Sequence, residues 1–192
     1  MSTLRVMKIT PRTGQQIQLA SGTALGLSTS AFGGIKGTPV QMTYNRTDTR
    51  TSINAPNDGQ NEITQTAIAI TPKFDGSLIV LKWMVSGEVH QDVGFRIYKN
   101  GTLWKSTTQT NQRWGVYVNG YYDRNQSSTM SNWYINAFDT ETEAGVENTY
   151  SLAVGTTNTS SYNFYLNRTQ GSGGQNSYEN GATIMTAMEI TR

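Results

Sequence analysis

Hydrophobic residues alternate with polar residues along the chain from about residue 37 onward, with a period of two. This period is typical of a β-strand that packs one side against a core and turns the other side to solvent. The alternating segments recur at roughly 8 to 15 residues and are separated by turn residues, which indicates strands joined by short loops. Because no helical period extends beyond about two turns, we predict an all-β fold of about eight or nine strands, arranged as a two-sheet antiparallel sandwich.

One predicted strand, residues 78–85, is hydrophobic on both sides. One side would carry Ile79, Leu81, Trp83 and Val85. The other side would carry Leu78, Val80, Lys82 and Met84. Strands of this kind are usually buried on both faces, so we expect a second layer of protein to cover the side that does not face the core.

Turn residues fix the positions of several strands. In the segment GFRIYKNGTLWK, Phe95 and Ile97 alternate with Arg96 and Tyr98, and Asn100–Gly101 supplies the two positive-φ residues of a type I′ turn, which predicts a β-hairpin. A second Asn-Gly pair, Asn119–Gly120, follows the segment RWGVYV. Four later strands are predicted from the residues that alternate in them: Trp133, Ile135 and Ala137; Tyr150, Leu152 and Val154; Tyr162, Phe164 and Leu166; and Ile184, Met188 and Ile190.

The first 36 residues differ from the rest of the chain. They are rich in Gly, Ser and Thr and offer only short alternations, such as Val6/Lys8 and Ile17/Leu19. So little apolar surface does not offset the conformational entropy that folding costs. We therefore predict two parts, an extended N-terminal arm at residues 1–36 and a β-sandwich domain at residues 37–192.

Charge and composition argue against several classes of partner. The chain has 15 basic and 13 acidic side chains, a net charge of +2 and no run of like charges, so it lacks the basic surface of a nucleic-acid-binding protein. It contains no cysteine, which excludes disulfides and thiolate chemistry. The longest uninterrupted apolar run, residues 78–81, is too short to cross a membrane, and residues 1–14 lack the apolar run of a secretory signal. We expect a protein that is made in a cytoplasm and binds neither nucleic acid nor membrane.

Few residues offer catalytic or metal-binding chemistry. His90 is the single histidine, which gives little basis for a Ser-His-Asp triad or a zinc site, and we expect no enzyme activity and no cofactor. In the segment DTETEAGVE, three carboxylates lie two residues apart, at Asp139, Glu141 and Glu143. On an extended segment they would project on one side and suit a hard cation such as calcium. The other interpretation is a charged turn before the next strand.

Aromatic and polar residues gather in the segment NQRWGVYVNGYYDRNQ. It contains Tyr121, Tyr122 and Arg124, and aromatic rings beside polar groups are suited to stack on sugars. A sugar-binding loop tip is one interpretation of this segment. Burial of its aromatic residues in the core or in an interface is the other.

Several segments, taken in order, resemble one protein family. GTPVQMTYNRTDT is similar to its opening strand, AIAITPKFDGSLIVLKWMVSGE to its Ile-Thr-Pro, turn and strand, and FRIYKNGT, TYSLAV and GATIMTAMEI to later strands. Together they span residues 37–192 and resemble the C1q/TNF-like jelly-roll domains of virion proteins from tailed bacteriophages, especially marine and cyanobacterial phages. The resemblance implies a homotrimer in which one sheet faces the threefold axis. The residues that we expect between subunits are Leu78, Val80, Lys82, Met84 and Met185.

The resemblance also implies a function. We expect a non-enzymatic structural protein of the virion, a capsid decoration (cement) or head-fibre protein, whose partners are its own copies and the phage major capsid protein or another virion protein. The arm would anchor it, because segments that alternate in this way can add a strand to an exposed sheet edge. The anchoring residues would be Leu4, Val6, Ile9, Ile17 and Leu19. The alternative is a short tail-fibre or receptor-binding tip that contacts host surface glycans through Tyr121, Tyr122 and Arg124, but the chain has no coiled-coil heptads to form a shaft.

Overall fold

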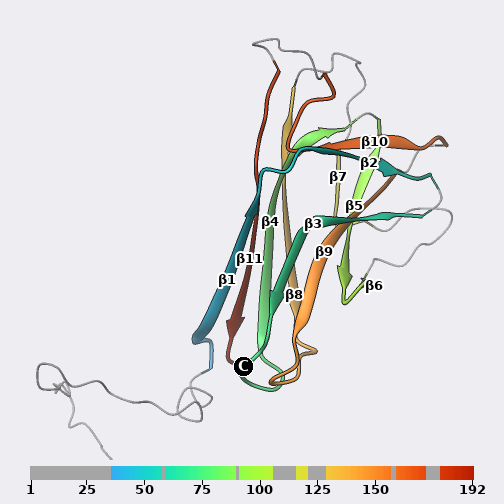
Figure 1. Cartoon of the computed structure of the whole chain (residues 1–192). Helices are drawn as coiled ribbons and strands as arrows, with labels where there is room; N and C mark the ends of the chain where they lie inside the picture. Colours follow the sequence, from blue (N-terminus) through green and yellow to red (C-terminus); the bar gives the residue numbers. More distant parts are fainter. Residues whose placement is uncertain are drawn as a thin grey trace, which may run out of the picture.

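The computed structural model describes residues 36–57, 59–89, 91–105, 116–120, 129–156, 159–171 and 178–192. The regular elements in these residues are all β-strands, which confirms the predicted all-β class (Figure 1). The strands are β1 (Pro39–Thr47), β2 (Thr51–Ala55), β3 (Asn61–Ile70), β4 (Leu78–Val89), β5 (Val93–Lys99), β6 (Thr102–Trp104), β7 (Val118–Gly120), β8 (Ser131–Asp139), β9 (Asn148–Thr156), β10 (Tyr162–Leu166) and β11 (Thr183–Ile190).

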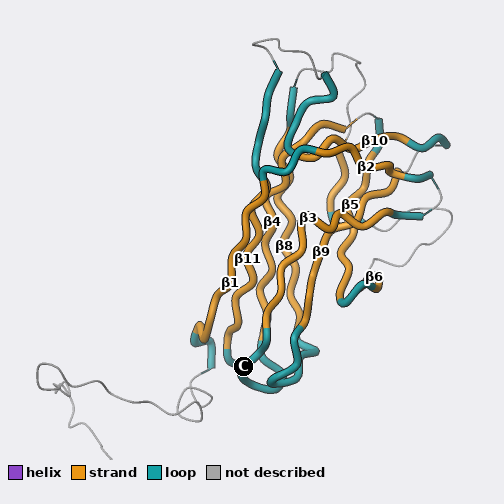
Figure 2. Tube along the Cα trace, in the orientation of Figure 1, coloured by secondary structure: helices purple, strands orange, loops and turns teal. Residues whose placement is uncertain are grey.

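The strands form two antiparallel sheets. The six-stranded sheet has the order β1-β11-β4-β10-β2, with β8 also paired to β4, and the five-stranded sheet has the order β3-β9-β5-β6, with β7 also paired to β5. The longest strand, β4, is central, because it pairs with β11, β8 and β10. Figure 2 shows β1, β11, β4 and β8 running side by side along the length of the molecule.

The core lies between the two sheets. The side of β4 that was predicted to face it, Ile79, Leu81, Trp83 and Val85, is at most 1% exposed. The five-stranded sheet contributes Phe95, whose ring centroid lies 5.4 Å from that of Trp133 and 5.3 Å from that of Phe164. The Trp83 indole N–H donates a hydrogen bond of 3.0 Å to the carbonyl oxygen of Thr66, so the largest fully buried side chain has its polar atom satisfied.

The two Asn-Gly pairs have different structures. Asn100 and Gly101 both have positive φ, 52° and 73°, and connect β5 to β6, as predicted for a type I′ hairpin. Asn119 and Gly120 lie instead within β7, which pairs with β5. A Cβ on Gly120 would come within 2.8 Å of the Trp133 indole nitrogen, so this glycine permits a close approach of an aromatic ring and does not form a turn.

One edge of the five-stranded sheet is covered by side chains of β1. Gln41 Nε2, Thr43 Oγ1 and Asn45 Nδ2 donate hydrogen bonds of 2.6, 3.1 and 3.4 Å. Their acceptors are the carbonyl oxygens of Thr71, Ala69 and Ala67, at the end of β3 and just beyond it. These three polar side chains therefore close the gap between the edge strands β1 and β3.

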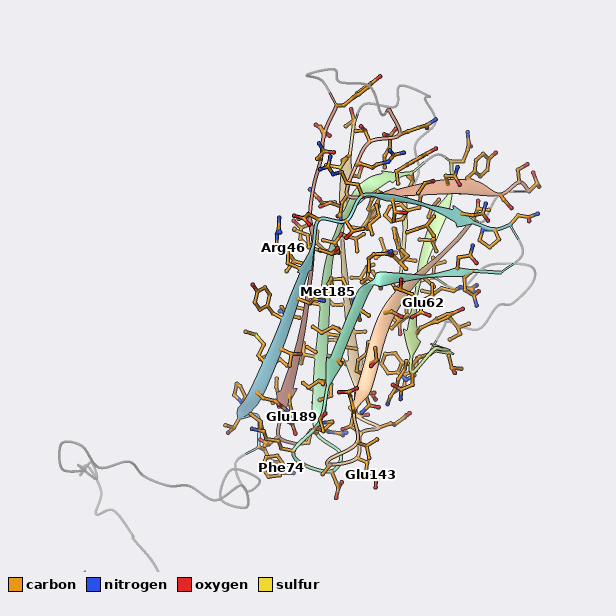
Figure 3. All side chains as sticks on the ribbon, in the orientation of Figure 1. Arg46, Glu62, Phe74, Glu143, Met185 and Glu189 are labelled. Atoms are coloured by element: carbon orange, nitrogen blue, oxygen red, sulfur yellow. The ribbon has the colours of Figure 1, made fainter. Side chains whose placement is uncertain are left out.

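A buried carboxylate holds the turn between β3 and β4. Glu189 of β11 is 0% exposed and lies beside Phe74 at one end of the sandwich (Figure 3). It accepts hydrogen bonds from the backbone N–H groups of Lys73 and Phe74, at 2.9 and 3.1 Å, and from Ser77 Oγ, at 2.7 Å. Gln41 Nε2 donates a further bond of 2.7 Å to the same carboxylate. Four donors thus compensate the burial of this charge.

The proposed anchoring residues lie outside the described part of the chain. The description begins at Lys36, so Leu4, Val6, Ile9, Ile17 and Leu19 are all in the undescribed N-terminal segment. The chain enters β1 beside the end of β11, because Gly37 N–H donates to Thr191 O at 2.8 Å and Thr191 N–H donates to Thr38 O at 3.0 Å. The described chain therefore begins at the end of the sandwich where β11 ends (Figure 1).

Candidate assembly surface

The side of the six-stranded sheet that faces away from the core is largely hydrophobic. The strand registers place alternate residues of β1, β11, β4 and β8 next to one another on this side. We call this surface the outer face, and its members are Met42, Tyr44, Arg46, Ile184, Thr186, Met188, Ile190, Leu78, Val80, Lys82, Met84, Tyr134, Asn136 and Phe138.

Several large side chains of the outer face are strongly exposed. Tyr44, Tyr134 and Phe138 are 70%, 66% and 59% exposed, and Met42 and Ile184 are 64% and 37% exposed. Since a full aromatic side chain covers about 150–250 Å², these five expose roughly 600 Å² of mainly apolar surface. The largest patch on a typical monomer is about 300–600 Å², and a specific interface covers about 800 Å² on each partner. The outer face therefore has nearly the area that a stable interface needs.

Strands β1 and β11 turn their more hydrophobic side away from the core. The inward residues of β11 include Thr183 and Glu189, whereas Ile184, Met188 and Ile190 point outward. The inward residues of β1 are the polar side chains that bind β3, whereas Met42 and Tyr44 point outward. In a sandwich that stays monomeric, the hydrophobic side of each strand would face the core. The outward sides of β1 and β11 are therefore suited to contact a second apolar surface.

The structure separates Met185 from the other predicted interface residues. It places Lys82 exposed on the outer face, Leu78 and Met84 half-buried there, and Val80 beside them at 9% exposure. Met185 is 0% exposed and belongs to the core (Figure 3). Its register partner on β4 is Trp83, an inward residue, so Met185 must face inward as well. The placement of Met185 in the interface is therefore wrong.

A row of polar residues crosses the middle of the outer face. Lys82 of β4 lies directly between Thr186 of β11 and Asn136 of β8, and Thr186 is in turn paired with Tyr44 of β1. A hollow of about 300 Å³ opens at this row and is lined by Lys82, Trp83, Met84, Tyr134, Asn136, Ile184 and Thr186. No residue in the described part of the chain forms an ion pair with Lys82. The lining of the hollow thus includes one lysine that has no ion-pair partner in the described chain, together with neutral polar residues and apolar residues.

The carboxylates of the segment 139–143 do not form a cation site. Asp139 is 0% exposed and accepts hydrogen bonds from Lys99 Nζ at 2.6 Å, Tyr150 Oη at 2.6 Å and the backbone N–H of Glu141 at 2.8 Å. Glu141 and Glu143 are exposed. Among the described residues there is no cluster of three metal-ligating side chains. The calcium interpretation fails because Asp139 points into the protein and is already paired with a cation.

The pKa of Asp139 results from two opposing effects. Burial alone raises the pKa of this carboxyl, but the hydrogen bonds from Lys99, Tyr150 and the Glu141 backbone outweigh burial and hold the pKa below its usual value. Burial and the same hydrogen bond to Asp139 raise the pKa of the Tyr150 hydroxyl. At neutral pH the Asp139 carboxyl is therefore ionised and the Tyr150 hydroxyl is neutral.

The lowered pKa of Asp139 predicts a loss of stability in acid. Because the native pKa lies below the unfolded value of about 3.9, the carboxylate stabilises the fold above that pH, and this stabilisation disappears as the pH falls through the native pKa. The free energy of unfolding, measured by urea denaturation from about pH 6 to about pH 2, should therefore decrease more steeply for the natural protein than for Asp139→Asn. A gap between the two proteins that stays constant with pH would contradict this assignment.

Two sequence predictions lie outside the described residues. Tyr121, Tyr122 and Arg124, the suggested glycan contacts, belong to the undescribed segment 121–128, and His90 is also undescribed. The outer face was found in part from the sequence, through the two-sided pattern of β4. Its contributions from β1 and β8 were missed, because Met42, Tyr44, Tyr134 and Phe138 alternate in the same way that core residues do.

Comparisons with known proteins give no family for this chain. No protein-family model matches the sequence, and no curated protein matches it. In the described part of the chain there is no helix that could span a membrane.

Proposed function

We propose that this protein is a non-enzymatic structural protein of a tailed-phage virion, a homotrimer of jelly-roll domains that decorates the outside of the capsid. The observation that carries the proposal is the outer face, a hydrophobic surface that spans four strands of one sheet and has no cover within the described chain. This surface is at the upper end of what monomers expose and approaches the area of a specific interface, which supports association with other copies. The proposal of a virion protein comes from the resemblance of residues 37–192 to phage jelly-roll domains.

The strand order supports a jelly roll. Strands β1, β11, β4 and β8 lie side by side in one sheet, and β3, β9 and β5 in the other, so the strands near the start of the domain pair with those near its end. Two packed sheets, each containing such long-range antiparallel pairs, are consistent with a jelly roll. Three copies arranged around an axis would cover all three outer faces in a closed assembly, with no hydrophobic surface left to extend it.

Attachment to the particle is assigned to residues 1–36. The described chain begins at one end of the sandwich, beside the last strand, so an anchor that precedes it would leave the opposite end projecting from the particle. The alternating segments of residues 1–36 are suited to add strands to a sheet edge of a capsid protein. Ordering the arm would cost roughly 1–2 kcal/mol per residue in conformational entropy, which only an extended docking surface would offset.

Deletion of residues 1–36 is expected to abolish binding to particles and to leave the β-domain folded. The measurement is co-sedimentation of labelled protein with particles that lack it, with circular dichroism to check the fold. A second variant keeps the full length and replaces Leu4, Val6, Ile9, Ile17 and Leu19 with serine. If both variants still decorate particles at full occupancy, the anchor assignment is wrong. Binding to host cells but not to particles would favour the receptor-binding alternative.

A further inference from the structure

We propose that the polar row of the outer face binds a small oxyanion, such as phosphate or a carboxylate, when copies of the protein assemble. This inference rests on the proposed trimer, because it concerns what happens to Lys82 when another copy covers it. The site consists of the Lys82 ammonium group and three neutral neighbours, Thr186, Asn136 and Tyr134, all of which line the same hollow.

A negative charge would compensate the burial of Lys82 in an assembly. The side chain is exposed in the single chain, so its ammonium group is hydrated there. When another copy covers the outer face, this charge leaves water, and an isolated buried charge is strongly unfavourable unless it is paired. Around a threefold axis the Lys82 residues of three copies would also approach one another, which adds repulsion between like charges.

The described residues of the outer face provide no carboxylate that could pair with Lys82. Every described member of the face is apolar, neutral and polar, or basic. The other cation of the face, Arg46, already has a partner, because its Nη1 atom lies 3.4 Å from Asp48 Oδ2. Elsewhere in the described chain, Lys99 is paired with Asp139 and Lys105 with Glu141. Lys82 differs from these in lying at the centre of an apolar surface with no counter-charge.

The groups around Lys82 are those that recognise oxygen acceptors. An ammonium group donates three hydrogen bonds, and hydroxyl and amide groups such as those of Thr186, Tyr134 and Asn136 can each donate as well. The hollow has a volume of about 300 Å³, whereas a water molecule occupies about 30 Å³, so phosphate fits within it. The apolar walls formed by Met84 and Ile184 lower the local dielectric constant and strengthen the attraction between ammonium and anion.

The test is a titration of the full-length protein with phosphate at constant ionic strength, with chloride as the balancing anion. Sedimentation measures the trimer association constant. For one anion per trimer, this constant should rise about 100-fold when phosphate reaches about 100 times its dissociation constant. Lys82→Met should remove the response to phosphate, and Lys82→Arg should keep it. Lys73→Met removes an exposed lysine of the β3–β4 turn and serves as the matched control, which should respond like the natural protein.

The source of the oxyanion is distinguished by a parallel titration with acetate. A saturable response to phosphate, together with broadening of the phosphate ³¹P NMR line that Lys82→Met abolishes, supports a free phosphate site. A response to acetate alone supports a site for a carboxylate, such as a partner's side chain. A trimer that responds to neither anion overturns the oxyanion site and leaves the proposed function intact. A monomer under all conditions overturns both.

Discussion

Replacement of Met42 by aspartate should dissociate the native assembly into folded monomers. Met42 is 64% exposed in the single chain and lies opposite Met188 on the outer face, so a polar residue at this position is compatible with the fold. If another copy covers the outer face, each subunit of the variant would bury an unpaired carboxylate, at a cost of about 3–5 kcal/mol per site. Light scattering and sedimentation at micromolar concentration should give the mass of three chains for the natural protein and of one chain for Met42→Asp.

The matched control for this experiment is Val146→Asp. Val146 is also a large hydrophobic residue that is 45% exposed, but it lies in the turn between β8 and β9, away from the outer face. The same charge introduced there should leave the mass unchanged. A natural protein that is monomeric at all concentrations, or a Met42→Asp variant that keeps the native mass, would show that the outer face is not the assembly interface.

Replacement of Glu189 by leucine should destabilise the domain by about 3–5 kcal/mol. The variant removes the acceptor for two backbone N–H groups, a serine hydroxyl and a glutamine amide, and each buried donor left without a partner costs about 1–3 kcal/mol. Some of these donors lie near the surface and will bind water instead. The total loss of stability therefore stays below the sum of the four separate penalties. The free energy of unfolding, from urea denaturation at one protein concentration, measures the effect.

The variant Glu143→Leu provides the comparison for Glu189. It makes the same chemical change at an exposed position in the β8–β9 turn, where no buried donor depends on the carboxylate. We expect its free energy of unfolding to stay within about 0.5 kcal/mol of the natural value. Equal losses in the two variants would mean that the hydrogen bonds to Glu189 contribute no more to stability than a solvated carboxylate.

The strands that form the core could be predicted from the sequence because their two sides differ clearly. In β5, the buried residues Phe95 and Ile97 alternate with polar ones, and the Asn100–Gly101 turn fixes the register of the hairpin. In β8, Trp133 and Ile135 are buried as predicted. Where one side of a strand is apolar and turn residues define its end, the pattern of period two is sufficient to predict which residues face the core.

The side of β11 that faces the core could not be predicted in this way, because both sides of the strand carry apolar residues. Its more hydrophobic side, with Ile184 and Ile190, faces outward, and its inward side contains Glu189. A buried glutamate is stable there only because the β3–β4 turn brings two backbone N–H groups to it, and no local pattern reveals that contact. The burial of Asp139 could not be predicted from a local pattern either, because its partners Lys99 and Tyr150 come from β5 and β9.

The two sides of β1 link the completion of folding to the formation of the outer face. The strand closes the edge of β3 with its polar side chains and contributes Met42 and Tyr44 to the outer face. It holds this position by pairing with β11, and the bond between Gln41 and Glu189 spans 148 positions in the sequence. Contacts over such separations are costly in entropy and slow to form. If copies assemble through the outer face as proposed, a chain that has not yet joined these two segments would lack part of that face, so incompletely folded chains would be excluded from the assembly.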